Sequence, residues 1–218
     1  MLAIIMIGDM MNLKEELEDY KMFRKMMQPY RQAIEVMKMK LAGIDDELRC
    51  ENGYSPIHNI QSRIKSPESI LEKLERKHYL CQKDSLKKLH DIAGLRVVCH
   101  YINDIQYISQ LLVMHDDIRL IKKMNYIDYP KETGYRSLYL VVEVPIYLKI
   151  GKMKLPVEIQ MRTIAMDFWA SLEHEILYKN QDEVPQEICE ELRECADRMA
   201  LTDLQMQRIY QKVYKKDG

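Results

Sequence analysis

Hydrophobic residues recur with helical spacing near both ends of the chain and with strand spacing in the middle. From residue 12 to about Gly43, an apolar stripe that is broken once, at Arg24, predicts one long helix or a pair of helices. The run Ser66–Glu68 supplies an N-cap serine, a first-turn proline and a first-turn acid, and it predicts a helix through about Lys77. A last helix is expected from residue 185, with a stripe at positions 188, 192, 195, 199, 202, 206, 209 and 213.

Between Ile92 and Arg162 the hydrophobic period changes to two, which predicts a sheet. Strands are expected around Leu95–Tyr101 and near residues 118–126, 138–145 and 155–161. The stretch 104–115 has helical spacing, so strand, helix and strand follow one another and predict an α/β core. After Thr163 a helix is expected to pack on the sheet through Ala165, Phe168, Trp169, Leu172 and Ile176.

The composition narrows the classes of protein that fit. Seven Gly, seven Pro and 47% hydrophobic residues exclude collagen-like and largely disordered chains. The length of 218 residues allows one domain with helical extensions. Since 33 Lys and Arg balance 34 Asp and Glu, no global positive field draws the chain to nucleic acid or anionic lipid. Neither DNA nor a membrane is expected as a partner, and phosphate binding must come from local clusters.

The cysteines and the N-terminal segment point to the cytoplasm. Five cysteines without a CxxC pair, and six scattered histidines, offer no zinc-finger spacing, so reduced thiols are expected. The apolar opening Met1–Ile7 has no basic residues and stops at Gly8, which is too short for a membrane span or an ordinary signal peptide.

Two acids are candidates for chemistry. The strand Val157–Arg162 alternates, with Glu158, Gln160 and Arg162 on its polar face. An ordinary half-buried strand would show the same pattern. Together with Asp91, which precedes another strand, and with nearby basic clusters, these residues could instead hold a divalent cation and a polyphosphate.

Basic residues cluster around the predicted helix start at Ser66. Five phosphate-capable side chains lie within 14 residues, near a helix N-terminus that itself favours anions, namely Arg63, Lys65, Ser69, Lys73 and Arg76. A solvated helix face explains such a cluster as well. Arg96 is on the polar side of a strand, where a guanidinium suits a planar or anionic partner.

The turn from Lys131 into the strand at Leu138 is a third candidate. Gly134 permits close backbone approach, and Tyr135 could present its ring to a base. Edge packing would explain this tyrosine equally well.

Familiar motifs of other enzyme classes are incomplete. His174 and Glu175 begin a HExxH pattern, but Tyr178 stands where the second zinc ligand is required. His90 and Asp91 form the dipeptide of HD-type phosphohydrolases, yet it runs directly into a strand, whereas those sites collect further His and Asp from helices. Neither a P-loop nor a GxGxxG sequence occurs.

Five runs, in order and spacing, resemble the synthetase domain of the RelA/SpoT family over about residues 30–180. They are Ser69–Lys73, Asp91–Arg96, Gly134–Leu138, Val157–Thr163 and Phe168–His174. The short chain is similar to the stand-alone small alarmone synthetases of bacteria. The resemblance implies a nucleotidyltransferase-like mixed sheet flanked by helices. It also implies (p)ppGpp synthesis in the stringent response, in which ATP gives its β,γ-pyrophosphate to the 3′-hydroxyl of GDP or GTP and AMP leaves.

The same resemblance implies a role for each candidate residue. Asp91 would hold Mg²⁺, while Glu158 would share the metal and act as base, and Gln160 would orient ribose or base. ATP would be bound by Arg63 and Arg96 on the two faces of adenine and by Lys65, Ser69, Lys73 and Arg76 along its phosphates. GDP or GTP would be bound by Tyr135 on guanine and by Lys131 near the phosphates. Tyr139 stands where the family commonly has His, which leaves the preference among GMP, GDP and GTP open.

We therefore expect an N-terminal helical region at residues 1–50, a catalytic core at 51–180 and a C-terminal oligomerisation helix at 181–218. The stripe of that last helix can be buried in its own core, against the N-terminal helix or against another subunit. The resemblance favours a homotetramer. An HD-like nucleotide hydrolase and a non-catalytic nucleotide-binding or RNA-binding module are the alternative functions.

Overall fold

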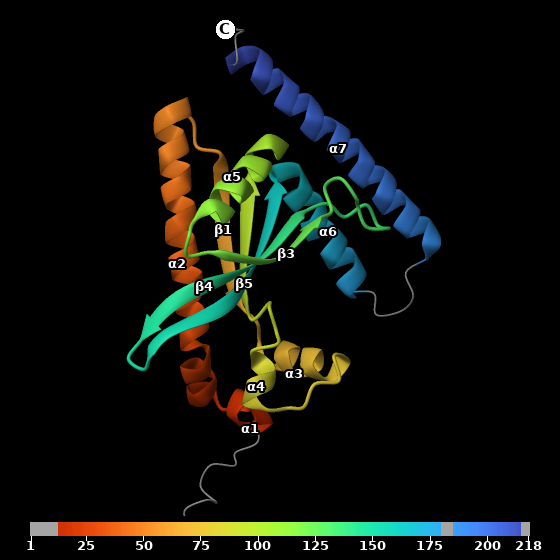
Figure 1. Cartoon of the computed structure of the whole chain (residues 1–218). Helices are drawn as coiled ribbons and strands as arrows, with labels where there is room; N and C mark the ends of the chain where they lie inside the picture. Colours follow the sequence, from red (N-terminus) through yellow and green to blue (C-terminus); the bar gives the residue numbers. More distant parts are fainter. Residues whose placement is uncertain (1–12, 180–184, 215–218) are drawn as a thin grey trace, which may run out of the picture.

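The computed structural model describes residues 13–179 and 185–214, which form a five-stranded mixed sheet flanked by helices (Figure 1). The expected fold class is therefore confirmed. In spatial order the strands are β1 (Ile57–Ile64), β2 (Ala93–Cys99), β5 (Gly151–Thr163), β4 (Leu138–Leu148) and β3 (Arg119–Asn125). Only the β2–β5 pair among them is parallel.

The helices are α1 (Leu13–Glu18), α2 (Tyr20–Asn52), α3 (Pro67–Arg76), α4 (Lys83–Leu86), α5 (Ile102–Met114), α6 (Ile164–Lys179) and α7 (Gln186–Tyr214). The apolar opening Met1–Ile7 lies outside the described residues. Within the described ranges, none of the helices is both long enough and apolar enough to span a bilayer.

The N-terminal stripe forms a pair of helices, and the second runs beyond Gly43. Asp19 caps α2 by accepting a hydrogen bond from the Met22 amide at 2.8 Å. The helix ends at Gly53, which adopts the left-handed conformation with φ of 74° that favours glycine.

Strand β1 was not expected from the sequence. Its three partly buried residues, Ile57, Ile60 and Ile64, are spaced three and four apart, which is helical rather than strand spacing. An edge strand with mostly exposed side chains does not need strict alternation, because little of it is buried. Antiparallel pairing with β2 fixes it in the sheet.

The two faces of the sheet differ. Helices α2 and α5 cover one face, where Met37 and Leu41 of α2 share the main core with Leu95, Val97 and Ile159 of the sheet. The opposite face carries the polar side chains of β2 and β5. This division lets the central strands β2 and β5 bury apolar side chains on one face and present charged groups on the other.

Helix α6 packs differently from the expectation. Phe168, Leu172 and Ile176 are exposed, and the buried residues of this helix are Met166, Trp169 and Ala170. The predicted face was therefore wrong in part. The physical reason is that α6 packs against α7, with the Trp169 indole donating to the Leu192 carbonyl at 3.0 Å.

The expected stripe of α7 is only partly covered within the chain. Its buried residues are Ala196 and Asp203, and of the stripe positions only Leu192 and Met199 pack against a buried cluster. Asp203 is tolerated inside because the Thr163 hydroxyl hydrogen-bonds its carboxylate. The remaining apolar stripe residues are exposed, namely Ile188, Met206, Ile209 and Val213.

Candidate functional site

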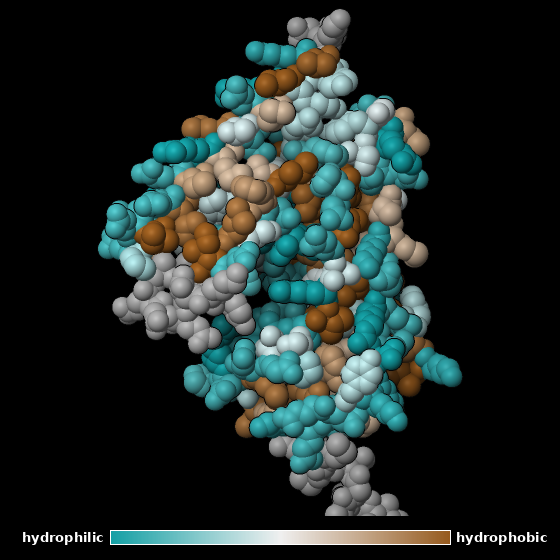
Figure 2. Space-filling view, turned by 180° about the vertical axis from the view of Figure 1, so that it is seen from behind, coloured by the Kyte–Doolittle hydropathy of each residue, from teal (hydrophilic) through white to brown (hydrophobic). Residues whose placement is uncertain are grey.

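Strand register brings the candidate residues together on the polar face of the sheet. Glu158 of β5 lies beside Gly94 of β2, whose other neighbour is Arg63 of β1. In the next row, Gln160 lies between Arg96 of β2 and Tyr139 of β4. Residues that are up to 97 positions apart, from 63 to 160, thus become neighbours. Figure 2, which views the molecule from behind, shows hydrophilic side chains around a hollow above the part formed by α3 and α4.

A cavity of about 530 Å³ opens on this face. That volume lies in the range of small-molecule sites, which is ~300–1,000 Å³. Of the expected residues, it is lined by Arg63, Arg96, Gln160, Lys131, Tyr135 and Tyr139. The sheet therefore places predicted ATP-binding and GDP-binding groups around one space. A smaller adjoining cavity of about 90 Å³ is also lined by Arg63, Arg96 and Gln160, and it adds Glu158.

Asp91 lies just before β2 and is held by two cations. One of its carboxylate oxygens, Oδ2, accepts a hydrogen bond from Lys65 Nζ at 2.8 Å and forms an ion pair with Lys73 Nζ at 2.6 Å. Burial alone would raise the pKa of Asp91, but the hydrogen bonds and charges of the two lysines outweigh burial and hold the pKa below its usual value. The carboxyl is therefore ionised at neutral pH.

The second oxygen of Asp91 fits a metal ligand. Oδ1 is buried and accepts no hydrogen bond from any residue in the described ranges. A buried carboxylate oxygen without a partner is costly unless a ligand occupies it. Hard oxygen donors of this kind suit Mg²⁺, so Asp91 is a fitting ligand. Glu158, which lies beside Gly94 of the strand that Asp91 precedes, is the second carboxylate expected to share the metal.

The two arginines expected to bind ATP, Arg63 and Arg96, lie along the β1–β2 pair. The Arg63 side chain lies over Gly94, since a Cβ added there would be in ordinary van der Waals contact with Arg63 Cγ, at 3.5 Å. Arg96 Nη1 is 3.4 Å from the Asp167 carboxylate, while its Nε is buried without a partner among the described residues. Both guanidinium groups border the large cavity.

Helix α3 presents part of the expected phosphate cluster. Ser66 caps α3 by accepting a hydrogen bond from the Ser69 amide at 3.3 Å. The first turn of the helix contains no basic residue; its basic residues, Lys73 and Arg76, are in the last turn. Lys73 reaches Asp91, and Lys65 approaches the same carboxylate from before the helix. Arg76 is exposed in the last turn, at the other end of the helix from Ser66, so the structure does not bring it to the Asp91 contacts.

Tyr135 is both packed and part of the cavity wall. Its ring is 8% exposed, and the cationic groups of Lys131 and Arg162 lie 4.9 and 5.1 Å from the ring centroid. Its hydroxyl is 2.7 Å from the Tyr139 hydroxyl and accepts from Arg162 Nη2 at 2.6 Å. Packing of Tyr135 is therefore confirmed, and recognition of a base by its ring stays a prediction.

No role was expected for Arg162 and Asp167. These two residues connect Tyr135 with Arg96 across the cavity. Arg162 is 5% exposed and donates to Asp167 Oδ1 at 3.0 Å and to Gln160 Oε1 at 3.2 Å. Burial would lower the pKa of Arg162, but Tyr135 and its other partners raise it, so the charge is retained. Gln160 in turn donates to Glu158 at 3.1 Å. In the sequence, the alternation of polar residues along β5 could have identified Arg162, and the acidic residue at the start of α6 could have identified Asp167.

Residues 62–183 match the family described as the region found in RelA / SpoT proteins. GTP pyrophosphokinase YwaC of Bacillus subtilis is 40% identical over 208 residues, which cover 95% of this chain and 98% of that protein. Small alarmone synthetase 1 of the same organism, solved bound to its product pppGpp, has a TM-score of 0.80 at 37% identity and covers 88% of this chain and 98% of its own. The same synthetase bound to AMPCPP has a TM-score of 0.75 at 33% identity, over 90% of this chain and all of its own.

Proposed function

The chain belongs to the RelA/SpoT family, and on that premise we propose how its residues divide the work of (p)ppGpp synthesis. The chain is a GTP pyrophosphokinase, which transfers pyrophosphate from ATP to the 3′-hydroxyl of GDP or GTP and releases AMP. One observation carries the residue assignments. Arg63 and Arg96 of the expected donor-binding set and Lys131, Tyr135 and Tyr139 of the expected acceptor-binding set line a single cavity, and Glu158 lines the smaller cavity beside it.

ATP occupies the side formed by β1, β2 and α3. Arg63 and Arg96 take adenine between their planar guanidinium groups, which suit stacking on an aromatic base. Lys65 and Ser69 face the phosphates near the N-terminus of α3, where the helix dipole also favours anions, and Lys73 reaches them from the last turn of the helix. Arg76 is assigned the outer end of the phosphate chain, since it is exposed on the last turn.

Asp91, through its unpartnered Oδ1, and Glu158 would hold Mg²⁺. When bound there, the ion would neutralise the charge that develops on the phosphates during transfer. Lys65 and Lys73 keep Asp91 ionised and bring positive charge to the same place.

Glu158 takes the proton of the acceptor's 3′-hydroxyl, and Gln160 orients the ribose or base beside it. As the new bond forms between the 3′-oxygen and the β-phosphorus of ATP, the bond from that phosphorus to the oxygen bridging to the α-phosphate breaks and AMP leaves. Most of the barrier falls through positioning and charge stabilisation, because phosphoryl-type transfer asks little covalent chemistry of the protein.

The guanine nucleotide occupies the side formed by the loop before β4. Tyr135 stacks on guanine, and Lys131 approaches the phosphates. Tyr139 replaces an imidazole with a neutral phenol whose pKa is raised by burial and by Tyr135, so it offers a hydrogen bond rather than a positive charge at neutral pH.

Assembly and location complete the proposal. The protein forms a homotetramer in the cytoplasm, where its nucleotide substrates are found. The exposed apolar residues of α7, including Met206, Ile209 and Val213, support assembly because a stripe of this kind is commonly covered by another subunit.

Incubation of the purified protein with ATP labelled in the β- and γ-phosphates, GDP and Mg²⁺ tests the proposed function. We expect label to appear in ppGpp, with one AMP released per transfer. A parallel incubation with ppGpp alone tests the hydrolase alternative, which would release GDP. Label that stays in ATP, or that appears only as free phosphate, would contradict the proposal.

A further inference from the structure

Helix α7 follows the last expected catalytic motif, yet it lies directly against the loop that binds the acceptor. A Cβ added to Gly134, whose φ is +89°, would lie 2.6 Å from Ala196 Cβ and 3.3 Å from Arg193 Cα. Only a residue without a side chain allows the loop backbone to approach the helix this closely. The helix is therefore in contact with the residue immediately before Tyr135.

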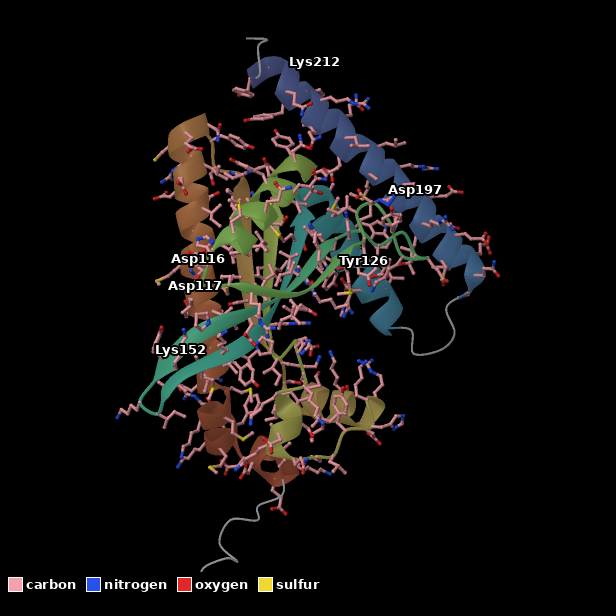
Figure 3. All side chains as sticks on the ribbon, in the orientation of Figure 1. Asp116, Asp117, Tyr126, Lys152, Asp197 and Lys212 are labelled. Atoms are coloured by element: carbon pink, nitrogen blue, oxygen red, sulfur yellow. The ribbon has the colours of Figure 1, made fainter. Side chains whose placement is uncertain are left out.

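An ion pair fixes the other flank of Tyr135. Arg136 Nη2 donates to Asp197 Oδ1 at 2.7 Å, and the Arg136 side chain is only 15% exposed. Figure 3 shows Asp197 on α7 at the side of the molecule where Tyr126 lies, in the turn that follows β3. Consecutive residues of α7, Ala196 and Asp197, thus hold the residues on either side of Tyr135.

The rest of α7 is attached firmly enough to act as a support. Trp169 donates to the Leu192 carbonyl, the buried pair Thr163 and Asp203 is hydrogen-bonded, and the Asn103 amide donates to Gln207 at 2.9 Å. Tyr135, Trp169, Ala170 and Ala196 form a buried cluster that is separate from the main core. The loop itself has few internal bonds, such as Gly134 to the Lys131 carbonyl at 2.8 Å.

We propose that Ala196 and Asp197 are positioning residues for the acceptor site: they hold Gly134–Arg136 so that Tyr135 borders the cavity, and they set the affinity for the guanine nucleotide without touching it. This inference rests on the proposed function through the role of Tyr135. Helix α7 is thereby part of the acceptor site, whatever its role in assembly. Among the described residues, the side-chain hydrogen bonds and ion pairs of Lys65 and Asp91 involve each other and Lys73 and none comes from α7, so we expect ATP binding not to depend on Ala196 and Asp197.

The test uses Asp197→Arg, which places a second guanidinium beside Arg136, and Ala196→Leu, which crowds Gly134. Glu194→Arg is the matched control, since it introduces the same charge one turn earlier, at an exposed pair with Arg198. We expect Asp197→Arg to raise KM for GDP about five- to tenfold, because a largely buried charge loses its partner, and to change KM for ATP less than twofold. Ala196→Leu should likewise raise KM for GDP more than KM for ATP, and the control Glu194→Arg should leave both KM values unchanged.

Amide hydrogen exchange of the full-length protein provides a readout that does not need turnover. Exchange should accelerate at residues 131–137 in both variants and stay unchanged in β2. Equal effects on the two KM values, a fall in kcat alone, or unchanged exchange in this segment would overturn the inference. An inactive wild-type protein whose variants still show the exchange change would instead contradict the proposed function.

Discussion

The proposed donor side and the proposed acceptor side of the cavity are supported by different parts of the fold. On the donor side, Arg63 and Arg96 lie on paired strands, and α3 is anchored by Ile70 and Leu74 in the main core that α2 builds under the sheet. On the acceptor side, Tyr135 belongs to a second buried cluster of four residues, contributed by a loop and by α6 and α7. Affinity for the two nucleotides can therefore change independently, and the acceptor side should open locally at a lower free energy.

The largest effect is expected where the two sides meet, at Glu158. In Glu158→Gln the amide is nearly isosteric but cannot take the proton, so turnover should fall by about 10²–10⁴ or more while both KM values stay within a few-fold. Initial rates and thermal unfolding would be measured together. Glu143→Gln, in the neighbouring strand and paired with Arg119, is a control that should keep full activity. Substantial turnover in Glu158→Gln at a normal Tm would contradict its role as base.

Asp91→Asn should also abolish Mg²⁺-dependent turnover, and it has a signature in stability. Because the pKa of Asp91 is lowered in the folded state, the carboxylate stabilises the fold above its unfolded pKa of about 4, and this contribution is lost as the pH falls through the folded value. The difference in Tm between wild type and Asp91→Asn should therefore be largest near neutral pH and shrink in acid. A difference that is constant from pH 7 to the acid range would show that Lys65 and Lys73 do not hold this charge.

Arg162→Lys tests the connection between the two sides. An ammonium group cannot reach Asp167, Tyr135 and Gln160 at once as the guanidinium does. We expect KM for GDP to rise about tenfold and KM for ATP to rise less, with a moderate fall in Tm because the site is buried. Arg198→Lys, at an exposed position of α7, is the control. A larger change in KM for ATP would place Arg162 with the donor side.

The smallest effect is expected at Tyr139. Tyr139→His restores the residue common in the family and removes a hydroxyl that contacts Tyr135 at 2.7 Å. The ratio of kcat/KM values for GDP, GTP and GMP should shift by about two- to fivefold, which corresponds to the ~0.5–1 kcal/mol net value of one hydrogen bond. Competition between the three acceptors measures it. An unchanged ratio would mean that this position does not touch the acceptor.

The sequence predicted most of the donor side, because its residues lie next to strong local signals. Ser66 and Pro67 mark the start of α3, and alternation marks β2 and β5. The sequence therefore indicates on which face of its helix or strand each of Lys73, Arg96 and Glu158 lies. The acceptor side was harder to predict, because the packing of Gly134 on Ala196 joins residues 62 positions apart and produces no local pattern in the sequence. For α7 the spacing indicated the stripe, but it could not show that the buried contacts within the chain are made by a small residue and an acid, Ala196 and Asp203, while most of the stripe stays exposed.

The most direct test of two separately supported sides compares Arg96→Ala with Tyr135→Ala in full steady-state kinetics over both substrates. We predict a crossed result, in which Arg96→Ala raises KM for ATP and Tyr135→Ala raises KM for GDP. Each rise should be about five- to 150-fold, as expected for the loss of ~1–3 kcal/mol of stacking on a base. KM for the other nucleotide should change only a few-fold in each variant. If each variant raised both KM values equally, the two sides would be one cooperative unit and the division described here would be wrong.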